Sequence, residues 1–444
     1  MRSSLVVAAN TTVLLLLACS SHGAAHILPP YTPALHPLPE PPTRLRRAHH
    51  DIDTQHGSSL PPRASVGHNT TAARTEAALA AMNSFYNQTA GQWTVTDAWW
   101  LSGVALTNLA DYMYKTGSRA FMAQAQHTID QQIAPVPWWP QGGGYFRADS
   151  TDDTGWWALA MVRMFDLGGN QTYLDIARLD EAYMYQYWTM SDCAGGLFVD
   201  IRARTYKNAI ANELYMLLAA SLHRRVPGDT AYLAKAVATW DWFAASGMLN
   251  SQNLVNDGLA ETAEEVCFNN QLPTWSYNQG VILGALTELY RATQNQTYIT
   301  TARAIADAVL ASASLTQNGT LTDPCEAADA CNNDQQIFKG IFARNLADLN
   351  GVLSDGPYAA YLQRNADTAF RRDRNATDFY DVRWAGPFRN STIAKQASAY
   401  IPCIVYCVYI FGMSSLPIVS CSVVVVMIRM MSIEKTRQTP TAAT

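Results

Sequence analysis

From about Thr71 onward, the chain alternates between two kinds of apolar segment. One kind is apolar on nearly every side, as in residues 156–165 and 281–286, and predicts helices that are buried all round. The other kind carries one polar face, as in residues 173–182, and predicts helices at the surface. The pattern therefore predicts pairs of helices, each with a buried and a half-exposed member.

A short marker recurs where each half-exposed segment begins. It consists of a turn residue, an aromatic residue four positions later and an alanine eight positions later. The copies are Gly117, Phe121 and Ala125; Gly169, Tyr173 and Ala177; Gly228, Tyr232 and Ala236; a weaker Gln294, Tyr298 and Ala302; and a partial copy at 353–361. This period of roughly 50 to 65 residues predicts five helical hairpins. Segments near Glu76 to Asn87 and Ser391 can supply a sixth, which predicts an all-α fold, an (α/α)6 barrel. An open solenoid is the alternative, but it would not need a buried inner layer so rich in Trp.

The polypeptide divides into segments of different composition. Arg2 followed by the apolar run 5–18 predicts a signal peptide over residues 1–24. Residues 25–70 are rich in Pro and His and predict a disordered stalk. The helical pattern covers 71–399 and predicts a single domain, which leaves a hydrophobic tail at 400–444.

Cysteines and glycosylation sequons support a secreted, extracellular or cell-surface location. Four cysteines fall in the helical region, and two disulfides among them allow three connectivities. The short polar loop between Cys325 and Cys331 favours that pair, which leaves Cys193 with Cys267. Seven Asn-x-Ser/Thr sequons follow the signal. They lie at Asn69, Asn87, Asn170, Asn295, Asn318, Asn375 and Asn390.

Charge and composition exclude some partners and suggest another. The net charge is −5 and the basic residues are scattered, so nucleic acid is not expected to bind. The Cys and His spacing fits no zinc site, and we expect neither a metal nor a cofactor. Polar and aromatic residues gather where the buried helices begin, which in a barrel is a single mouth suited to a sugar. They are Asp97, Trp99, Trp100, Asp152, Asp153, Trp156, Trp157, Lys207, Asn208, Asn212, Trp275, Tyr277, Asn278 and Gln279.

The adjacent Asp152 and Asp153 are the candidate catalytic carboxylates. Acids in the first turn of a helix also occur simply because they interact favourably with the helix dipole. Here a buried helix with Trp156 and Trp157 follows at once, and acids at a buried mouth need a reason to be there. Glycoside hydrolysis needs one ionised and one protonated carboxyl group, and separations of about 5 Å accompany retention of configuration. We expect Asp152, nearer the helix amides, to be ionised and Asp153 to hold a proton.

Several segments together resemble glycoside hydrolase family 76, the endo-α-1,6-mannanases, particularly its fungal cell-wall branch. They are DDTGWWAL at 152–159, KNAIAN at 207–212, VNDG at 255–258, WSYNQG at 275–280 and FKGIFAR at 338–344. The resemblance implies an (α/α)6 fold, a retaining mechanism with Asp152 as nucleophile and Asp153 as acid/base, and no metal. It also implies Asp257 as a substrate-binding acid, although an aspartate before Gly258 can simply form a turn.

Further substrate contacts are predicted from residue type and position. They are Trp156, Asn208, Asn212, Tyr277, Asn278 and Gln279. For the amides, a structural hydrogen bond is an equal alternative. Trp99, Trp100 and Trp157 are expected in the core, because their helices are so apolar.

The predicted activity is that of a mannan endo-1,6-α-mannosidase acting on cell-wall α-mannan. A transglycosidase that links mannosylated or lipid-anchor glycans to cell-wall polysaccharide would use the same residues. A non-catalytic mannan-binding protein is a further alternative, although such a protein would be expected to lack one of the aspartates. An unsaturated uronyl hydrolase or an epimerase on the same fold would need other signatures, such as a histidine pair at the mouth for the epimerase.

The C-terminal tail is the last feature. Residues 401–431 are long and apolar enough to span a membrane, and Arg429, Lys435 and Arg437 lie at the end of the run. We expect a membrane anchor there. An atypical lipid-anchor signal and a wrongly read gene end are the alternatives.

Overall fold

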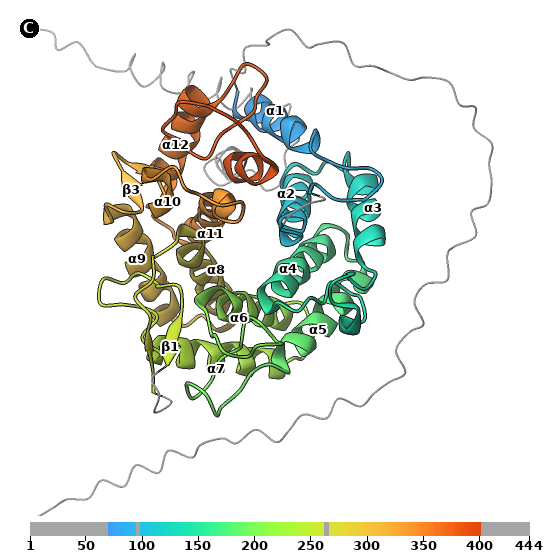
Figure 1. The fold of residues 1–444 in the computed structure, drawn as a ribbon, viewed down its shortest axis with the longest axis vertical. Coiled ribbons are helices and arrows are strands. Elements are labelled where there is room, and N and C mark those ends of the chain that lie inside the picture. The colour runs from blue at the N-terminus through green and yellow to red at the C-terminus, as the bar shows by residue number, and fades with distance from the viewer. Residues whose placement is uncertain (1–69, 95–97, 262–265, 401–444) are drawn as a thin grey trace, which may run out of the picture. The chain divides into compact units, whose positions relative to one another are not determined.

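The computed structural model describes residues 70–94, 98–261 and 266–400, and these form a double ring of helices (Figure 1). The inner ring contains α2 (Trp100–Thr116), α4 (Thr151–Gly168), α6 (Ala209–His223), α8 (Ser276–Thr293) and α11 (Phe338–Val352). The outer ring contains α1 (Thr71–Asn83), α3 (Met122–Gln132), α5 (Gln171–Tyr185), α7 (Ala231–Ala245), α9 (Gln296–Ala311) and α12 (Ala359–Thr368). Each inner helix is followed in the chain by an outer one.

The ring is closed by a helix over residues 393–400. Its Ala397 carbonyl accepts from Asn108 Nδ2 of α2 at 3.3 Å, and its Ser398 Oγ accepts from the Gly340 amide of α11 at 3.0 Å. Gln396 Nε2 donates to the Ala78 carbonyl of α1 at 2.9 Å. The two ends of the described region thus form the sixth hairpin, and the predicted (α/α)6 barrel is confirmed.

The predicted domain boundary at Ala399 lies within this closing helix. The sixth inner helix continues to residue 400, and Ala399 and Tyr400 are fully buried in it. A boundary at Ala399 would cut through the core, because this helix supplies one sixth of the inner wall.

The recurring sequence marker corresponds to the reversal between inner and outer helices. Gly117, Gly169 and Gln294 end α2, α4 and α8 in the left-handed conformation, with φ of 72°, 69° and 58°. Asn170 and Asn295 then cap α5 and α9 by accepting from backbone amides two residues on, at 3.1 and 3.0 Å. A left-handed residue therefore ends the inner helix and lets the chain turn back along the outside.

Aromatic side chains fill the space between the neighbouring inner helices α2 and α4. Trp157 is completely buried and stacks on Phe146 with ring centroids 4.7 Å apart. Trp99 packs 5.0 Å from Trp157, and Trp99 and Trp100 are each 8% exposed. Gly103 makes this packing possible, because a Cβ there would lie 3.1 Å from the Trp157 ring. The expectation that these tryptophans belong to the core is confirmed.

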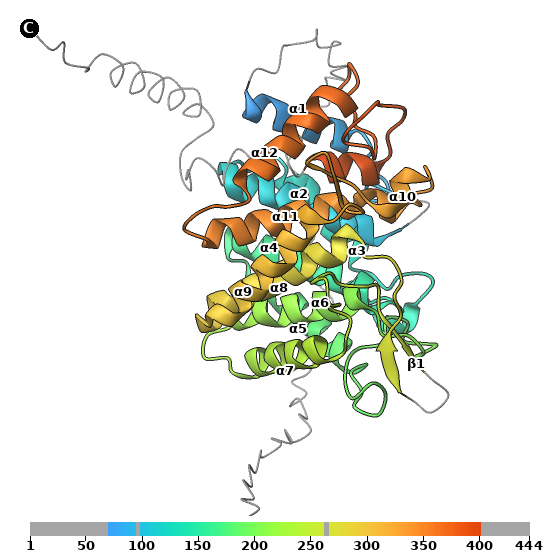
Figure 2. The ribbon, with the colours of Figure 1, turned by 90° about the vertical axis from the view of Figure 1, so that its left-hand side faces the viewer.

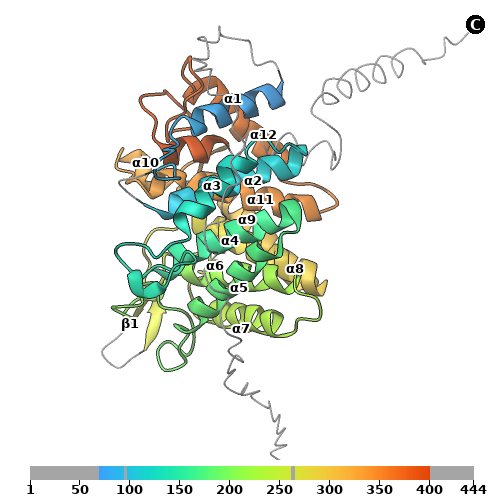
Figure 3. The ribbon, with the colours of Figure 1, turned by 90° about the vertical axis from the view of Figure 1, so that its right-hand side faces the viewer.

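Two side views place the long connections at one end of the ring, where the inner helices begin (Figures 2 and 3). We call this end the mouth. β1 (Leu259–Glu261) and α10 (Pro324–Ala327) both lie there, and β1 pairs with β2 (Cys267–Asn269). The remaining elements are short: β3 (Thr316–Gln317), β4 (Thr320–Leu321), η1 (Pro140–Gly142), η2 (Gln335–Ile337) and the π-helical η3 (Ala369–Asp373).

Both predicted disulfides are present, Cys193–Cys267 and Cys325–Cys331. Asn87, Asn170, Asn295, Asn318 and Asn390 are exposed and Asn375 is half-exposed, so these six sequons remain predicted glycosylation sites. Asn69, the predicted signal peptide, nearly all of the predicted stalk and all but the first residue of the predicted tail lie outside the described residues. Within the described ranges, no helix combines the length and the apolar character needed to cross a membrane.

Candidate active site

The first turn of α4 holds Asp152 and Asp153, both half-buried at the mouth. The Ser150 hydroxyl and the Asp153 backbone amide both donate to Asp152 Oδ1, the latter at 3.1 Å. Among the described residues, none forms a hydrogen bond to the Asp153 carboxyl group. The helix therefore gives the two neighbouring acids different surroundings.

These surroundings act differently on the two pKa values. Burial raises the pKa of Asp152, while the donors Ser150 and Asp153 N–H oppose the rise. Burial also raises the pKa of Asp153, to well above its usual range, and the charges of Asp152, Asp334 and Asp149 add to the rise. Asp152 is the better stabilised carboxylate of the pair, and Asp153 is the group more readily protonated.

Asp334 is a third acid at this position that sequence reasoning missed. It accepts from Trp100 Nε1 at 3.0 Å, and its negative charge raises the pKa of both Asp152 and Asp153. Its position immediately before η2 resembles an ordinary polar loop or helix cap. The only signal for it in the sequence was its place four residues before the FKGIFAR segment.

Asp257 lies at the same mouth, beside the start of α6. The Ala209 amide donates to the Asp257 carbonyl at 2.8 Å, which holds the two segments together. The Tyr206 hydroxyl donates to Asp257 Oδ2 and accepts from Asn270 Nδ2 at 2.9 Å. Gly258 permits this approach, because a Cβ there would lie 2.5 Å from the Tyr206 hydroxyl. Tyr206 is a second residue that sequence reasoning did not single out.

Tyr277 lies within electrostatic range of both Asp152 and Asp257. Its ring stacks on Phe338 with centroids 3.7 Å apart and planes within 3°. Burial raises the pKa of its hydroxyl well above the usual range, and the charges of Asp257, Asp152, Glu213 and Tyr206 raise it further. Tyr277 is therefore a neutral hydrogen-bond donor within electrostatic reach of Asp152 and Asp257.

Asn212 and Gln279 occupy positions different from those expected of sugar-binding residues. Asn212 exchanges hydrogen bonds with the Leu197 amide (2.7 Å) and carbonyl (3.2 Å) and also donates to the Asn208 carbonyl. Gln279 accepts from the Val255 amide and donates to its carbonyl, at 2.8 and 2.7 Å. Both amides are fully buried. These bonds support a role in fixing the mouth loops, which is the structural alternative to direct contact with a sugar.

The other predicted contacts differ in their surroundings. Asn208 caps α6 by accepting from the Ala211 amide at 3.1 Å. Asn278 is fully buried, and neither polar atom of its side chain has a hydrogen-bond partner within the described part of the chain. Glu213, also fully buried, has no hydrogen-bond partner there either, and burial raises its pKa well above the usual range. An acid inside an apolar helix was a visible signal for Glu213 that sequence reasoning passed over.

Trp156 lies one turn deeper than the acids. It stacks on Trp100 with centroids 5.2 Å apart and lines a cavity on the side of the ring away from the mouth. It is 6% exposed, so its placement supports a packing role beneath the site more than the expected sugar platform.

The mouth can therefore supply an ionised carboxylate, an adjacent protonated carboxyl group and several hydrogen-bonding side chains. These are the groups needed for acid-assisted displacement at an acetal carbon. No set of three or more His, Cys, Asp or Glu side chains suited to a metal ion occurs among the described residues.

Comparison with known proteins identifies the family. The model of glycosyl hydrolase family 76 matches residues 70–403, about three quarters of the chain, and the protein belongs to that family.

Curated relatives share moderate identity with it. A putative mannan endo-1,6-α-mannosidase of Schizosaccharomyces pombe is 27% identical over 305 residues, which cover 65% of this chain and 67% of the relative. The mannan endo-1,6-α-mannosidase DCW1 of Candida albicans is 28% identical over 275 residues, which cover 57% of this chain and 58% of the DCW1 chain. The chain thus spans only about three fifths to two thirds of these relatives.

Solved structures share the fold. An inactive variant of the α-1,6-mannanase GH76A of Salegentibacter sp. HEL1_6, in complex with α-1,6-mannotetrose, has a TM-score of 0.68 at 20% identity. The match covers 76% of this chain and 98% of that one. Dfg5 from Chaetomium thermophilum, in complex with glucosamine, also has a TM-score of 0.68 at 20% identity. That match covers 79% of this chain and 92% of the Dfg5 chain.

Proposed function

We propose that the protein is a retaining mannan endo-1,6-α-mannosidase. The observation that carries this proposal is the pair Asp152 and Asp153 at the barrel mouth, in surroundings that raise the pKa of Asp153 further than that of Asp152. Two carboxyl groups with separated pKa values are what glycoside hydrolysis requires.

In the proposed reaction, Asp152 attacks the anomeric carbon as Asp153 protonates the departing glycosidic oxygen. The C–O bond to the leaving sugar breaks, and a glycosyl ester forms on Asp152. Asp153, now ionised, then takes a proton from water, whose oxygen attacks the same carbon and releases Asp152. Retention follows because the configuration inverts twice.

Asp257 and Tyr277 are the proposed contacts for sugar hydroxyls. Both are half-buried, and the charges of Asp257 and Asp152 both raise the pKa of the Tyr277 hydroxyl, so the three groups lie within electrostatic range of one another. Asn208, Asn212 and Gln279 are proposed to position the loops that carry them.

The relatives support α-1,6-mannan as the substrate. The fungal relatives bear the name mannan endo-1,6-α-mannosidase, and the Salegentibacter variant holding α-1,6-mannotetrose was inactivated by changing two consecutive aspartates. A consecutive pair at the mouth is the arrangement found here.

The decisive experiment compares Asp152→Ala and Asp153→Ala, with Asp175→Asn as control. Asp175 lies on the exposed face of α5, where it contacts Arg178 and Gln171. On α-1,6-mannan, both active-site variants should lose activity, Asp153→Ala by on the order of 10²- to 10⁴-fold. The control should retain it.

An aryl glycoside of α-1,6-mannobiose separates the two roles. Its leaving group departs without protonation, so Asp153→Ala should form the glycosyl-enzyme and accumulate it, and azide should release it. Rescue of only the Asp152→Ala variant would invert the assignment. Full activity of either variant on mannan would refute it.

Product analysis with an added acceptor glycan distinguishes hydrolysis from transfer. Reducing mannooligosaccharides without acceptor-linked product identify a hydrolase, whereas a new acceptor-linked product identifies a transglycosidase. Both outcomes use the same glycosyl-enzyme.

We also infer a secretory route to the cell surface or cell wall. The signal sequence, the sequons and the two disulfides support it. Anchoring through the tail remains a prediction, because residues 401–444 lie outside the described region.

A further inference from the structure

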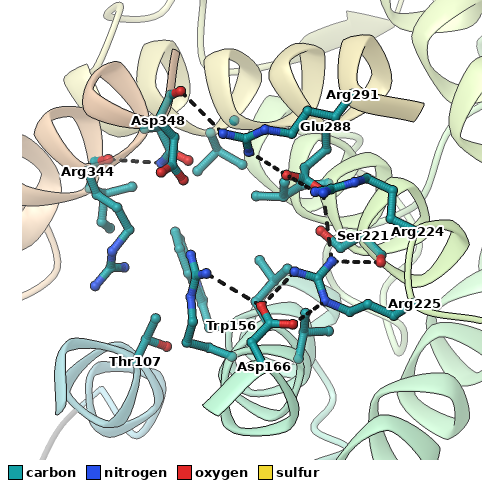
Figure 4. Close-up of a pocket in the computed structure, with 18 of the residues that line it drawn as sticks. Thr107, Trp156, Asp166, Ser221, Arg224, Arg225, Glu288, Arg291, Arg344 and Asp348 are labelled. Atoms are coloured by element: carbon teal, nitrogen blue, oxygen red, sulfur yellow. Dashed lines mark hydrogen bonds and ion pairs between the residues drawn. The ribbon is translucent and has the colours of Figure 1, made fainter. Parts of the chain in front are cut away.

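A second polar cavity lies in the barrel away from the mouth (Figure 4). It has a volume of about 450 Å³ and is lined mainly by the C-terminal halves of the inner helices. On α4, for example, Arg163 and Asp166 line it, while Asp153 is ten residues before Arg163. At 1.5 Å rise per residue, roughly 15 Å of helix separates the two sites. Trp156 forms part of the wall facing the mouth.

This rear cavity carries an excess of positive charge. Five guanidinium groups line it against three carboxylates, and the lining residues with charge are Arg163, Arg224, Arg225, Arg291, Arg344, Asp166, Glu288 and Asp348. Two further charged residues, Asp111 and Lys115, are not part of the lining. Asp111 pairs with Arg163 at 2.8 Å and with Arg344 at 3.0 Å, and it interacts electrostatically with Lys115. The opposite charges of Asp111 and Lys115 cancel. Two positive charges therefore remain uncompensated, in a protein whose net charge is −5.

Arg224, Arg225 and Arg291 form ion pairs with carboxylates that line the cavity. Arg225 forms a two-pronged pair with Asp166, with both N–O distances at 2.6 Å. Glu288 accepts from Arg224 at 2.7 Å and from Arg291 at 2.6 Å. These contacts hold the guanidinium groups in fixed positions around the cavity (Figure 4).

Two arginines have N–H groups for which the described residues provide no acceptor. Arg344 uses Nε for Asp111 and Nη2 for Asn108, and Arg224 uses only Nη1, for Glu288. Within the described part of the chain, Nη1 of Arg344 and Nε and Nη2 of Arg224 have no acceptor. The Arg224 side chain is 36% exposed, so this part of the cavity lining is in contact with solvent.

We propose that the rear cavity is a binding site for a small phosphate- or sulfate-bearing ligand. Guanidinium groups bind such oxyanions through paired, charge-assisted hydrogen bonds, and pre-positioned groups lose little freedom on binding. An oxyanion would compensate the excess positive charge. It would also accept hydrogen bonds from the N–H groups of Arg224 and Arg344 that have no acceptor among the described residues. The apolar part of the wall, formed by Leu159, Val162, Leu217, Val281 and Ile341, leaves room for a monosaccharide attached to the oxyanion.

The proposal is independent of the catalytic assignment and is tested by titration calorimetry on the secreted protein at constant ionic strength. Inorganic phosphate, glucose 6-phosphate and glucose are titrated separately, with sodium chloride balancing the salt. We expect saturable binding of one phosphate per chain and none of glucose. Tighter binding of glucose 6-phosphate than of phosphate would identify a sugar ester as the ligand class, and equal binding a free oxyanion.

Arg224→Gln and Arg344→Gln are the test variants, and Arg178→Gln is the matched control. Arg224 is chosen because Glu288 keeps Arg225 and Arg291 as partners after the change. Arg178 pairs with Asp175 on the exposed face of α5. Arg224→Gln should weaken phosphate binding about tenfold or more and leave mannanase activity in phosphate-free buffer unchanged. The control should bind phosphate like the unmodified protein.

Several results would overturn the proposal. Absence of phosphate binding at millimolar concentration would show that the arginines only brace the rear of the barrel. Unchanged phosphate binding in Arg224→Gln would place any site elsewhere, and Arg224→Gln remains decisive even if Arg344→Gln fails to fold. Binding of glucose without binding of phosphate would also refute an oxyanion site.

Discussion

Replacing both cysteines of Cys193–Cys267 by serine should destabilise the protein about twice as much as the same change at Cys325–Cys331. The first disulfide closes a loop with a sequence separation of 74 and the second one of 6. Cys193 lies in the segment that precedes Tyr206, and Cys267 begins β2, the partner of β1. The longer loop therefore also joins two connections at the mouth.

The magnitude follows from the entropy that each cross-link removes from the unfolded chain. A loop of 74 residues corresponds to roughly 4.4 kcal/mol at 25 °C and one of 6 residues to roughly 2.2 kcal/mol. The native contacts beside Cys193 persist in the serine variant, because Trp242 Nε1 still donates to the carbonyl of residue 193, as it now does at 2.8 Å. The expected difference between the two variants is thus about 2 kcal/mol.

Urea unfolding of both double-serine variants measures this difference directly. Activity on α-1,6-mannan should also fall further in Cys193→Ser/Cys267→Ser, since the loops carrying Tyr206 and Asp257 lose their cross-link. Equal losses of stability in the two variants, or a larger loss for Cys325→Ser/Cys331→Ser, would refute the chain-entropy reasoning. Unchanged activity in the first variant would show that the hydrogen bonds of Asn212 and Gln279 suffice to position the mouth.

Two further predictions concern the acids at the mouth and the end of the domain. Asp334→Asn should move the alkaline limb of the kcat/KM profile to lower pH, because removing a negative charge lowers the pKa of Asp153. Asp153 must be protonated to act as the acid. An unmoved limb would exclude this role for Asp334. A chain ending after residue 403 should be secreted as folded, active protein, whereas one ending at Asn390 should not, since it lacks the inner helix containing the buried Ala397 and Tyr400. Secretion of active enzyme by the shorter chain would contradict the closure of the ring by residues 393–400.

Local sequence signals predicted the features of this fold that depend on local physics. A buried helix followed by a left-handed residue and a capped outer helix can be read directly, as at Gly169 and Asn170. The aspartate pair was also visible, because two acids before an apolar, Trp-containing helix are costly without a function. The disulfide partners followed from the short loop at Cys325 and from elimination.

Features that depend on contacts between distant segments could not be read in this way. Asn212 and Gln279 stand among apolar residues, and either a sugar or a loop could satisfy such an amide; only the positions of Leu197 and Val255 identify the loop as the partner. Asp334 looks like a loop residue until Trp100, 234 positions away, donates to it.

The rear cavity shows the same limit most clearly. Arg224 and Arg225 follow α6, and Arg291 lies in the last turn of α8, positions where basic residues ordinarily complement the helix dipole and face solvent. In a closed ring, the ends of successive inner helices converge, so residues that are individually unremarkable become neighbours with a common charge. Asp152 and Asp153 lie at the opposite end of the ring, in the first turn of α4, by the same geometry. In this protein, one arrangement of helices thus carries acids at the mouth and an excess of arginines at the rear, and the Asp152–Asp153 pair has the clearer sequence signature because its two residues are adjacent in the chain.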